Sequence, residues 1–177
     1  TRIGDAYFVS KDYSNAVEYY SQAAKINALN NDYVVFQQAS AMGVLGRFDS
    51  KIETLQKLIN TYPKSPYLDD AKYELANTYL IQNQNEKALS VLTKLVDEFP
   101  NSSYVKKCLL KMALIYYNSD QNKLALELNK RIIADYPQSA EAREALTNMR
   151  TIYIETSNLA EFEDYLKTKS ITISAST

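Results

Sequence analysis

Apolar residues recur along this chain at the three- and four-residue spacing of amphipathic helices, not at the two-residue alternation of strands. One apolar stripe consists of Leu75, Ala76, Tyr79 and Leu80, and a second of Ala88, Leu89, Leu92, Leu95 and Val96, with a polar turn over residues 82–87 between them. The next segment repeats this order, with Met112, Ala113, Tyr116 and Tyr117 followed by Ala125, Leu128, Ile132 and Ile133. Each segment is therefore predicted to be a helix-turn-helix hairpin.

The prolines give the period of these hairpins. Pro63, Pro100 and Pro137 are each 37 residues apart and lie in Tyr/Phe-Pro-x-Ser tetrapeptides. Because proline disfavours a helix at and before its own position, each should end the second helix of a hairpin. The serines of the tetrapeptides, Ser65, Ser102 and Ser139, are predicted to cap the next helix, and Pro66 to be a first helical residue.

A fixed period of this length is typical of stacked repeats. We predict an all-α solenoid of about five hairpins, at residues 1–30, 31–65, 66–102, 103–139 and 140–169, forming one domain over residues 1–169. The tail, residues 170–177, alternates isoleucine with Ser and Thr and could be a strand or a linker, of which a linker is favoured. The start at Thr1, inside a predicted helix, suggests a fragment of a larger protein.

Composition narrows the chemistry. The chain has no His and one Cys, which excludes imidazole catalysis, Cys/His zinc sites and internal disulfides. Its 20 basic and 21 acidic residues give a net charge of -1, so no global field attracts nucleic acid. The longest apolar run, residues 112–117, is far shorter than the roughly 18 residues of a membrane helix. We predict no enzyme activity, cofactor, metal, nucleic-acid partner or membrane insertion by this segment.

The hairpins resemble the tetratricopeptide repeat, in which a small residue and a tyrosine in the first helix are followed by Ala-x-x-x-Phe and a terminal proline. The residues that carry the resemblance are Ile3, Gly4, Tyr7, Ala16, Tyr20 and Ala23; Ala39, Met42, Gly46, Phe48, Leu55, Leu58 and Pro63; Leu75, Ala76, Tyr79, Ala88, Leu92 and Pro100; Met112, Ala113, Tyr116, Ala125 and Pro137; and Met149 and Tyr153. Four positions depart from it: Lys51, Arg150 and Phe162 replace small residues, and Asn129 stands where an aromatic is expected.

The resemblance implies a right-handed superhelix whose concave wall is lined by the first helix of each hairpin. On that wall it places Phe8, Tyr33, Phe36, Tyr73, Asn77, Leu80, Lys107, Leu110, Leu114 and Tyr117, together with Ser40, Glu144 and Thr151. These residues form a candidate peptide groove, with Phe36, Tyr73 and Tyr117 as its main contacts. The alternative is that several of them complete the repeat core.

Other candidate sites are weaker. A clamp for a C-terminal carboxylate would need basic and Asn residues on adjacent first helices, but Tyr73 stands where a base is expected beside Asn77. Cys108 has no His to activate it and is predicted to be a small apolar residue. Asp69 and Asp70 are predicted in a helix first turn, and the acidic clusters Asp97-Glu98 and Glu161-Glu163-Asp164 on solvated faces. The 15 tyrosines lack the basic groove that base stacking requires.

The sequence thus predicts a non-catalytic protein-protein interaction scaffold that holds a protein or peptide partner on its concave face. The alternative is a structural spacer or self-association module of a larger multi-repeat protein. The 37-residue repeat and its linker resemble long repeats of bacterial envelope proteins, which favours the periplasm or cell envelope by analogy and leaves the cytoplasm possible.

Overall fold

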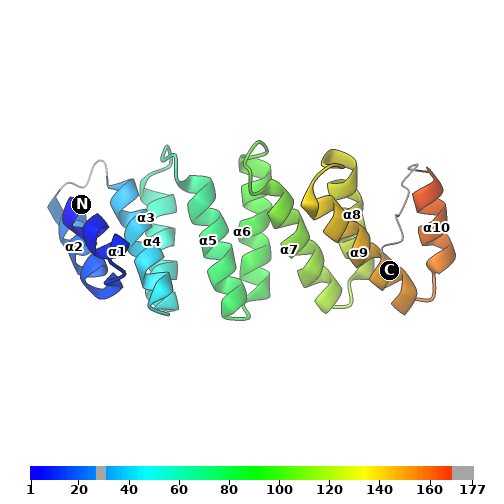
Figure 1. The fold of residues 1–177 in the computed structure, drawn as a ribbon, viewed down its shortest axis with the longest axis horizontal. Helices are drawn as coiled ribbons and strands as arrows, with labels where there is room; N and C mark the ends of the chain where they lie inside the picture. The colour runs from blue at the N-terminus through cyan, green and yellow to red at the C-terminus, as the bar shows by residue number, and fades with distance from the viewer. Residues whose placement is uncertain (27–30, 169–177) are drawn as a thin grey trace. The chain divides into compact units, whose positions relative to one another are not determined.

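The computed structural model describes residues 1–26 and 31–168, and every regular element within these ranges is an α-helix (Figure 1). The helices are α1 Arg2–Val9, α2 Tyr13–Ile26, α3 Asp32–Val44, α4 Phe48–Thr61, α5 Leu68–Ile81, α6 Asn85–Glu98, α7 Val105–Asn118, α8 Asn122–Asp135, α9 Ala140–Glu155 and α10 Leu159–Thr168. They pair in sequence as five hairpins, which confirms the predicted all-α solenoid of helical hairpins. Below, the odd-numbered helices are the first helices and the even-numbered ones the second helices.

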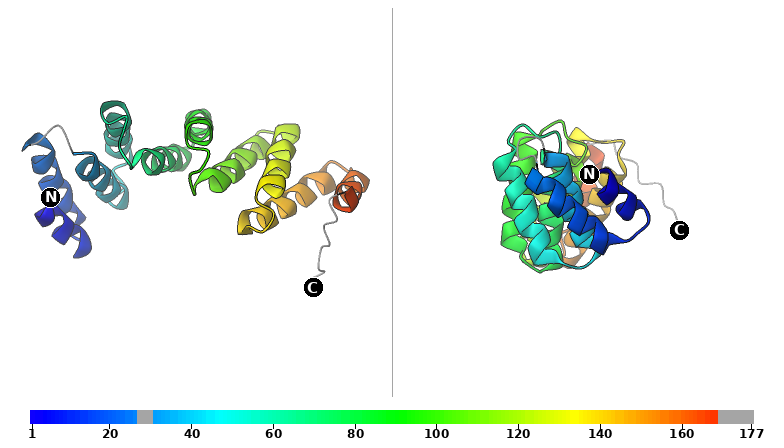
Figure 2. Two further views of the ribbon diagram at one scale, coloured as in Figure 1. Left: turned by 90° about the horizontal axis from the view of Figure 1, so that it is seen from above. Right: turned by 90° about the vertical axis from the view of Figure 1, so that its left-hand side faces the viewer.

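The chain divides into two compact units, one over residues 1–105 and the other from Lys106 onward. In the first unit each helix packs on the next in sequence from α1 to α6. Viewed from above, α3 and α5 lie in one row and α4 and α6 in another (Figure 2). In the second unit α9 packs on α8 and α10 on α9. The single domain over residues 1–169 stays a prediction.

Small residues let the helices of a hairpin approach closely. Ala16, Ala88 and Ala125, one from each of three second helices, are completely buried. Gly4 on α1 shows how tight the approach is, because a Cβ atom placed there would lie 2.8 Å from the ring of Tyr20 on α2. Such contact between helices is what the repeat needs to bury its apolar faces.

The turn inside each hairpin contains one residue with a left-handed backbone. Four of these residues follow the 37-residue period, namely Gly46, Asn83, Asp120 and Ser157, and Lys11 plays the same part in the first hairpin. Their φ angles lie between 57° and 69°. Only one of the five is glycine, so the packing of the two helices, more than the local preference of the residue, sets this geometry.

The proline linkers end helices as predicted. Helices α4, α6 and α8 stop two residues before Pro63, Pro100 and Pro137. Ser139 caps α9, since its Oγ accepts a hydrogen bond from the Ala142 N–H. Each proline therefore ends the second helix of its hairpin, as the fixed proline φ angle requires.

The other two predicted caps are wrong. The Ser65 and Ser102 hydroxyls accept hydrogen bonds from the N–H groups of Tyr67 and Tyr104, and their helices begin only at Leu68 and Val105. Pro66 therefore precedes α5 and does not start it. An extra turn, closed by the serine side chain, separates these linkers from the next helix. The turn predicted over residues 82–87 is also shorter, because α6 begins at Asn85, and the tail at 170–177 lies outside the described residues.

Three of the four departures from the repeat pattern are buried. Phe162 packs against Tyr153, with 5.7 Å between ring centroids, and so joins α10 to α9. Lys51 and Asn129 are buried polar residues, and both are taken up below. Arg150 is exposed.

Candidate functional site

Residues predicted on the groove lie at the surface of the first helices. Lys107 and Leu114 are exposed, and the other eight are half-buried: Phe8, Tyr33, Phe36, Tyr73, Asn77, Leu80, Leu110 and Tyr117. Ser40 is also half-buried, and Glu144 and Thr151 are exposed. Two of the set contribute to packing, because Phe8 and Tyr33 lie against the apolar cluster of the first unit. These surface positions leave side chains available to a partner.

Two aromatic stacks recur in the first unit. Phe36 on α3 stacks on Tyr67, with ring centroids 5.5 Å apart and 12° between the ring planes. Tyr73 on α5 stacks on Tyr104 at 4.3 Å and 20°. The second pair repeats the first pair 37 residues further along the chain. Each pair connects a first helix to the segment that precedes the next first helix. The result is a repeated pair of half-exposed rings whose orientation is fixed before any partner binds.

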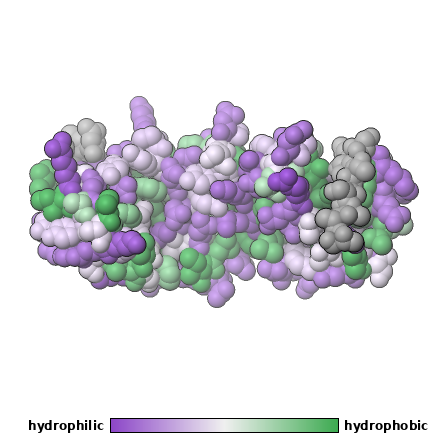
Figure 3. Space-filling view, in the orientation of Figure 1, coloured by the Kyte–Doolittle hydropathy of each residue, from purple (hydrophilic) through white to green (hydrophobic). Residues whose placement is uncertain are grey.

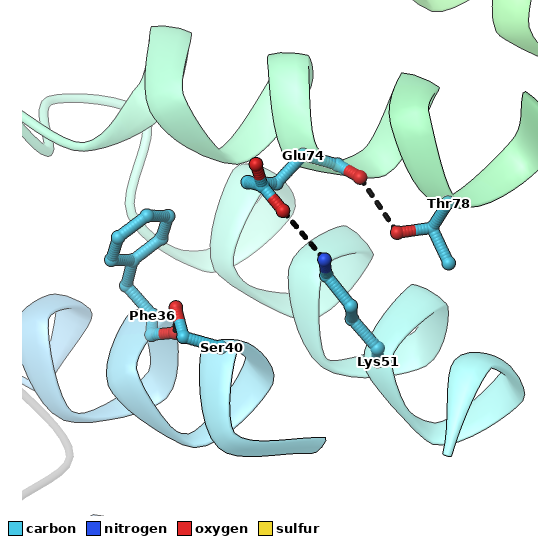
Figure 4. Close-up of polar contacts among 5 residues, drawn as sticks. All are labelled: Phe36, Ser40, Lys51, Glu74 and Thr78. Carbon is cyan, nitrogen blue, oxygen red and sulfur yellow. Dashed lines mark hydrogen bonds and ion pairs between the residues drawn. The ribbon is translucent and has the colours of Figure 1, made fainter. Parts of the chain in front are cut away.

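An ion pair with a buried lysine joins α4 to α5 (Figure 4). Lys51 extends from α4, and its Nζ lies 2.5 Å from Oε2 of Glu74 on α5. Phe36 and Ser40 lie on α3 beside this pair, and the Thr78 hydroxyl donates to the main-chain carbonyl of Glu74. The site therefore combines an aromatic surface with a charged pair.

Gly43 makes room for that lysine. A Cβ atom at Gly43 would lie 3.1 Å from both Cδ and Nζ of Lys51. The Lys51 side chain is only 9% exposed, whereas that of Glu74 is 38% exposed. Lys51 is a large residue at a position where the repeat pattern has a small one. A glycine on the neighbouring helix provides the space for it.

Tyrosine hydroxyls join successive helices through carboxylates. Tyr20 and Tyr33 both donate to Oδ1 of Asp5, at 2.7 and 3.1 Å. Burial and then the hydrogen bond to Asp5 raise the pKa of Tyr20 above its ordinary value, and the same causes raise the pKa of Tyr33. These two tyrosines connect α2 and α3 to α1, so their main contribution is to the packing of the three helices.

The second tyrosine-carboxylate connection uses the acidic first turn of α5. Tyr104 donates to Oδ1 of Asp70 at 2.7 Å, and the Ser102 hydroxyl donates to Oδ2 of Asp69 at 2.7 Å. The hydrogen bond to Asp70, followed by burial, raises the pKa of Tyr104. Both aspartates lie in the predicted first turn, and both also hold the linker that follows α6.

In the second unit, Leu114 and Tyr117 lie beside a small pocket. Its volume is about 70 Å³, and its walls come from α7, α8 and α9: Ala113, Leu114, Tyr117, Asn129, Asn148, Thr151 and Ile152. The Tyr117 hydroxyl donates to the carboxylate of Glu155, at 2.7 and 2.8 Å to its two oxygens. This hydrogen bond raises the pKa of Tyr117. The pocket thus unites residues of two first helices and one second helix.

Cys108 and the acidic residues at 97–98 and 161–164, which the sequence did not favour as catalytic residues, are either buried in the core or exposed on helix surfaces. Cys108 is completely buried, and burial raises the pKa of its thiol to about 12. Glu98 is exposed as predicted, and it also forms an ion pair with the buried Lys72. The acidic cluster at 161–164 is exposed as predicted. No group of three metal-ligating side chains occurs in residues 1–26 and 31–168, and none of the described helices is long and apolar enough to cross a bilayer.

The sequence reasoning missed three features of these surfaces. It did not assign Tyr67 and Tyr104 as stacking partners, although their spacing from each other is 37 residues. It treated Lys51 as a packing defect and did not pair it with Glu74. It noted Asn129 as a departure but found no pocket there. Only the first of these has a signal in the sequence, namely the repeated Ser-x-Tyr at residues 65–67 and 102–104.

Consecutive helical hairpins with a shared turn geometry and surface aromatics on the first helices define an α-solenoid repeat protein. A tetratricopeptide repeat profile matches residues 33–65, 70–102 and 107–139, and a second tetratricopeptide repeat profile matches residues 1–28. These matches cover more than half of the chain, which belongs to the tetratricopeptide repeat family. Proteins of this family generally mediate protein-protein interactions.

Solved structures share the fold at low sequence identity. A crystal structure of MamA is 19% identical, with a TM-score of 0.74 over 93% of this chain and 91% of that chain. A tetratricopeptide repeat protein from Parabacteroides merdae is 17% identical, with a TM-score of 0.74 over 94% and 64%. YrrB, described as having an unusual peptide-binding site, is 15% identical, with a TM-score of 0.66 over 88% and 75%. A comparison with curated proteins found no match.

Proposed function

We propose that this chain is a non-catalytic scaffold that binds an extended segment of a protein partner on the surface of its first helices. The carrying observation is the pair of half-exposed aromatic stacks, Phe36 with Tyr67 and Tyr73 with Tyr104. Rings already held in place can bury apolar area against a partner without a large further loss of side-chain entropy. The similarity of the fold to YrrB, whose description names a peptide-binding site, supports the same reading.

The remaining predicted groove residues also lie on first helices. In the first unit they are Phe8, Tyr33, Asn77 and Leu80, and in the second Lys107, Leu110, Leu114 and Tyr117. Of the Lys51–Glu74 pair, the glutamate is 38% exposed and could accept a hydrogen bond from the main chain of a bound segment. Specificity would then come from the aromatic contacts together with this polar pair.

Selection from a random-peptide display library tests the proposal directly. Peptides that bind the full chain should lose about tenfold or more in affinity to a variant carrying Phe36→Ala and Tyr73→Ala, since aromatic contacts dominate such interfaces. Tyr19→Ala is the matched control, because Tyr19 also stacks on another tyrosine, Tyr7, at 5.2 Å, but lies on a second helix. Undiminished binding to the folded double variant would contradict the proposal.

Self-association is a second candidate because α1 leaves apolar side chains uncovered. Ile3 and Val9 are 56% and 82% exposed, and an open groove on this helix is lined by Arg2, Ile3, Ala6, Tyr7 and Ser10. Apolar colour remains visible at the N-terminal hairpin in Figure 3. If this surface joins two copies, light scattering should give a dimer that Val9→Asp converts to monomer. A monomer at all concentrations would remove this candidate.

The assignment to a bacterial envelope subgroup stays part of the proposal. It is supported by the 37-residue period and the Tyr/Phe-Pro-x-Ser linkers. Fractionation of cells that produce the natural protein, followed by detection with an antibody against this segment, would test it. Recovery with the cytoplasmic fraction would contradict the subgroup while leaving the binding proposal intact.

A further inference from the structure

Acidic residues are concentrated on the first helices of the first unit. Helices α1, α3 and α5 carry five acidic residues and two basic ones, namely Asp5, Asp32, Asp69, Asp70 and Glu74 against Arg2 and Lys72. The second helices of the same unit are nearly balanced, with six acidic and five basic residues. Lys72 is buried and paired with Glu98 on α6, and Arg2 lines the open groove on α1, which Asp5 does not line. The first helices of this unit therefore present a negatively charged surface.

Three aromatic rings form a cluster on these helices, with Tyr33 and Phe36 on α3 and Tyr67 just before α5. Tyr67 connects the other two, since its ring centroid lies 5.5 Å from that of Phe36 and 6.0 Å from that of Tyr33. All three side chains are half-buried, so each is partly exposed to solvent. The Tyr33 hydroxyl donates to Asp5, so a partner meets the ring and not a free hydroxyl proton.

Two aspartates beside Tyr33 keep an oxygen that a partner can reach. Oδ1 of Asp5 accepts from the Tyr20 and Tyr33 hydroxyls, and Oδ1 of Asp32 accepts from the Tyr33 N–H at 3.0 Å. Oδ2 of each aspartate accepts no hydrogen bond from the described residues, and neither atom is among their buried polar atoms without a partner. Because both residues are half-buried, these two oxygens are in contact with solvent. Neither aspartate forms an ion pair within residues 1–26 and 31–168.

We propose that these five residues, below called the Tyr33 patch, bind an arginine side chain of the partner segment: Tyr33, Phe36, Tyr67, Asp5 and Asp32. A cation is attracted to the face of an aromatic ring, and the planar guanidinium group can lie on a ring while its N–H groups donate to a neighbouring carboxylate. A lysine ammonium group is a point charge and lacks this flat, forked geometry. The inference rests on the proposed function and deepens it, because Tyr33 and Phe36 belong to the predicted partner-binding surface. It adds a preferred residue type to the partner.

Two matched peptides test this preference without a known partner. The first repeats Gly-Ser-Arg and has both ends blocked, and the second carries citrulline in place of arginine, which keeps the planar group but has no charge. Each is titrated into the full isotope-labelled chain, and the backbone amide signals of Tyr33, Phe36 and Tyr67 are followed by NMR. The arginine peptide should give saturable shifts at these signals and bind about tenfold more tightly than the citrulline peptide. Equal affinities, or no saturable shifts at these signals, would overturn the proposal.

Substitutions at the aspartates separate the Tyr33 patch from general attraction to acidic surfaces. Asp5→Asn combined with Asp32→Asn keeps the acceptor oxygens but removes two charges, so the affinity for the arginine peptide should fall about tenfold. Asp12→Asn combined with Asp49→Asn is the control, because these aspartates lie just before α2 and on α4, and it should change the affinity less than about twofold. Equal losses in the two double variants would overturn the proposal. Asp32→Asn alone should lower the affinity severalfold, and it serves if the first double variant does not fold.

Selection from the peptide library distinguishes this inference from the proposed function. Selected peptides should be enriched in arginine and should lose affinity to the variant that carries Phe36→Ala and Tyr73→Ala. If they lose affinity to this variant but contain no excess of arginine, the inference fails and the binding function stands. If their affinity does not depend on Phe36 and Tyr73, both fail.

Discussion

The Lys51–Glu74 pair predicts an asymmetry between two substitutions that break the same contact. Lys51 is 9% exposed and Glu74 38% exposed, so the lysine depends on its partner far more than the glutamate does. Glu74→Ala leaves a buried ammonium group, whereas Lys51→Met leaves a carboxylate that water can reach. We therefore expect the glutamate substitution to destabilise the chain more than the lysine substitution.

The expected magnitudes follow from burial. Removing one partner of a buried pair costs about 3–5 kcal/mol, and the partial exposure of Glu74 lowers the expected cost of Glu74→Ala below this range, to about 2–3 kcal/mol. Met keeps the length and most of the volume of the Lys51 stem beside Gly43, so Lys51→Met should cost less than about 1.5 kcal/mol. In the double variant no ammonium group remains, and its stability should lie within about 1 kcal/mol of Lys51→Met alone.

Urea unfolding at neutral pH, followed by far-ultraviolet circular dichroism, measures these differences. Glu53→Ala is the control, because Glu53 is an exposed glutamate on the same helix as Lys51 and should change stability by less than about 0.5 kcal/mol. Equal costs for Glu74→Ala and Lys51→Met would refute the reasoning. So would a double variant as unstable as Glu74→Ala, because the loss would then not come from the unpaired lysine.

Three further predictions concern contacts within the repeats. Gly4→Ala should lower stability by about 1–2 kcal/mol in thermal unfolding, since the overpacking against the Tyr20 ring exceeds the helix-propensity gain, and an unchanged Tm would contradict this. The free energy of unfolding should be constant up to about pH 10 and then fall, because the hydrogen bond to Asp70 raises the pKa of Tyr104 and ionisation would place a phenolate beside a carboxylate. Urea unfolding at a series of pH values measures this fall, which Tyr104→Phe should make smaller. The same substitution should cost about 1–2 kcal/mol at pH 7, since it removes the hydrogen bond. Cys108, buried and with a pKa near 12, should react with a disulfide reagent at least about a hundredfold more slowly in the folded chain than in urea, and equal rates would show that the thiol is accessible.

The sequence predicted the helices well because their signals are local and repeated. Apolar spacing identified the hairpins, and Pro63, Pro100 and Pro137 marked the helix ends to within two residues. The caps were less predictable, since the same Ser follows all three prolines but only Ser139 caps a helix directly. Whether an extra turn follows the serine depends on the contacts of the next residues, such as the hydrogen bond from Tyr104 to Asp70, 34 residues away.

The candidate site shows the same division. Sequence register placed Phe36 and Tyr73 at equivalent surface positions, but their stacking on Tyr67 and Tyr104 depends on segments brought together by helix packing. The Lys51–Glu74 pair likewise requires Gly43 on a third helix.

By itself, the sequence determined that this chain is an all-α array of hairpins with a 37-residue period and lacks imidazole chemistry, because periodicity and composition need no tertiary information. Only the tertiary structure decided what its unusual polar residues do. Lys51 forms half of an interhelical ion pair, and Asn129 is a buried residue that lines a pocket and donates to the Ala125 carbonyl. Burial and hydrogen bonding depend on residues distant in the chain, so a single position in a repeat pattern cannot reveal them.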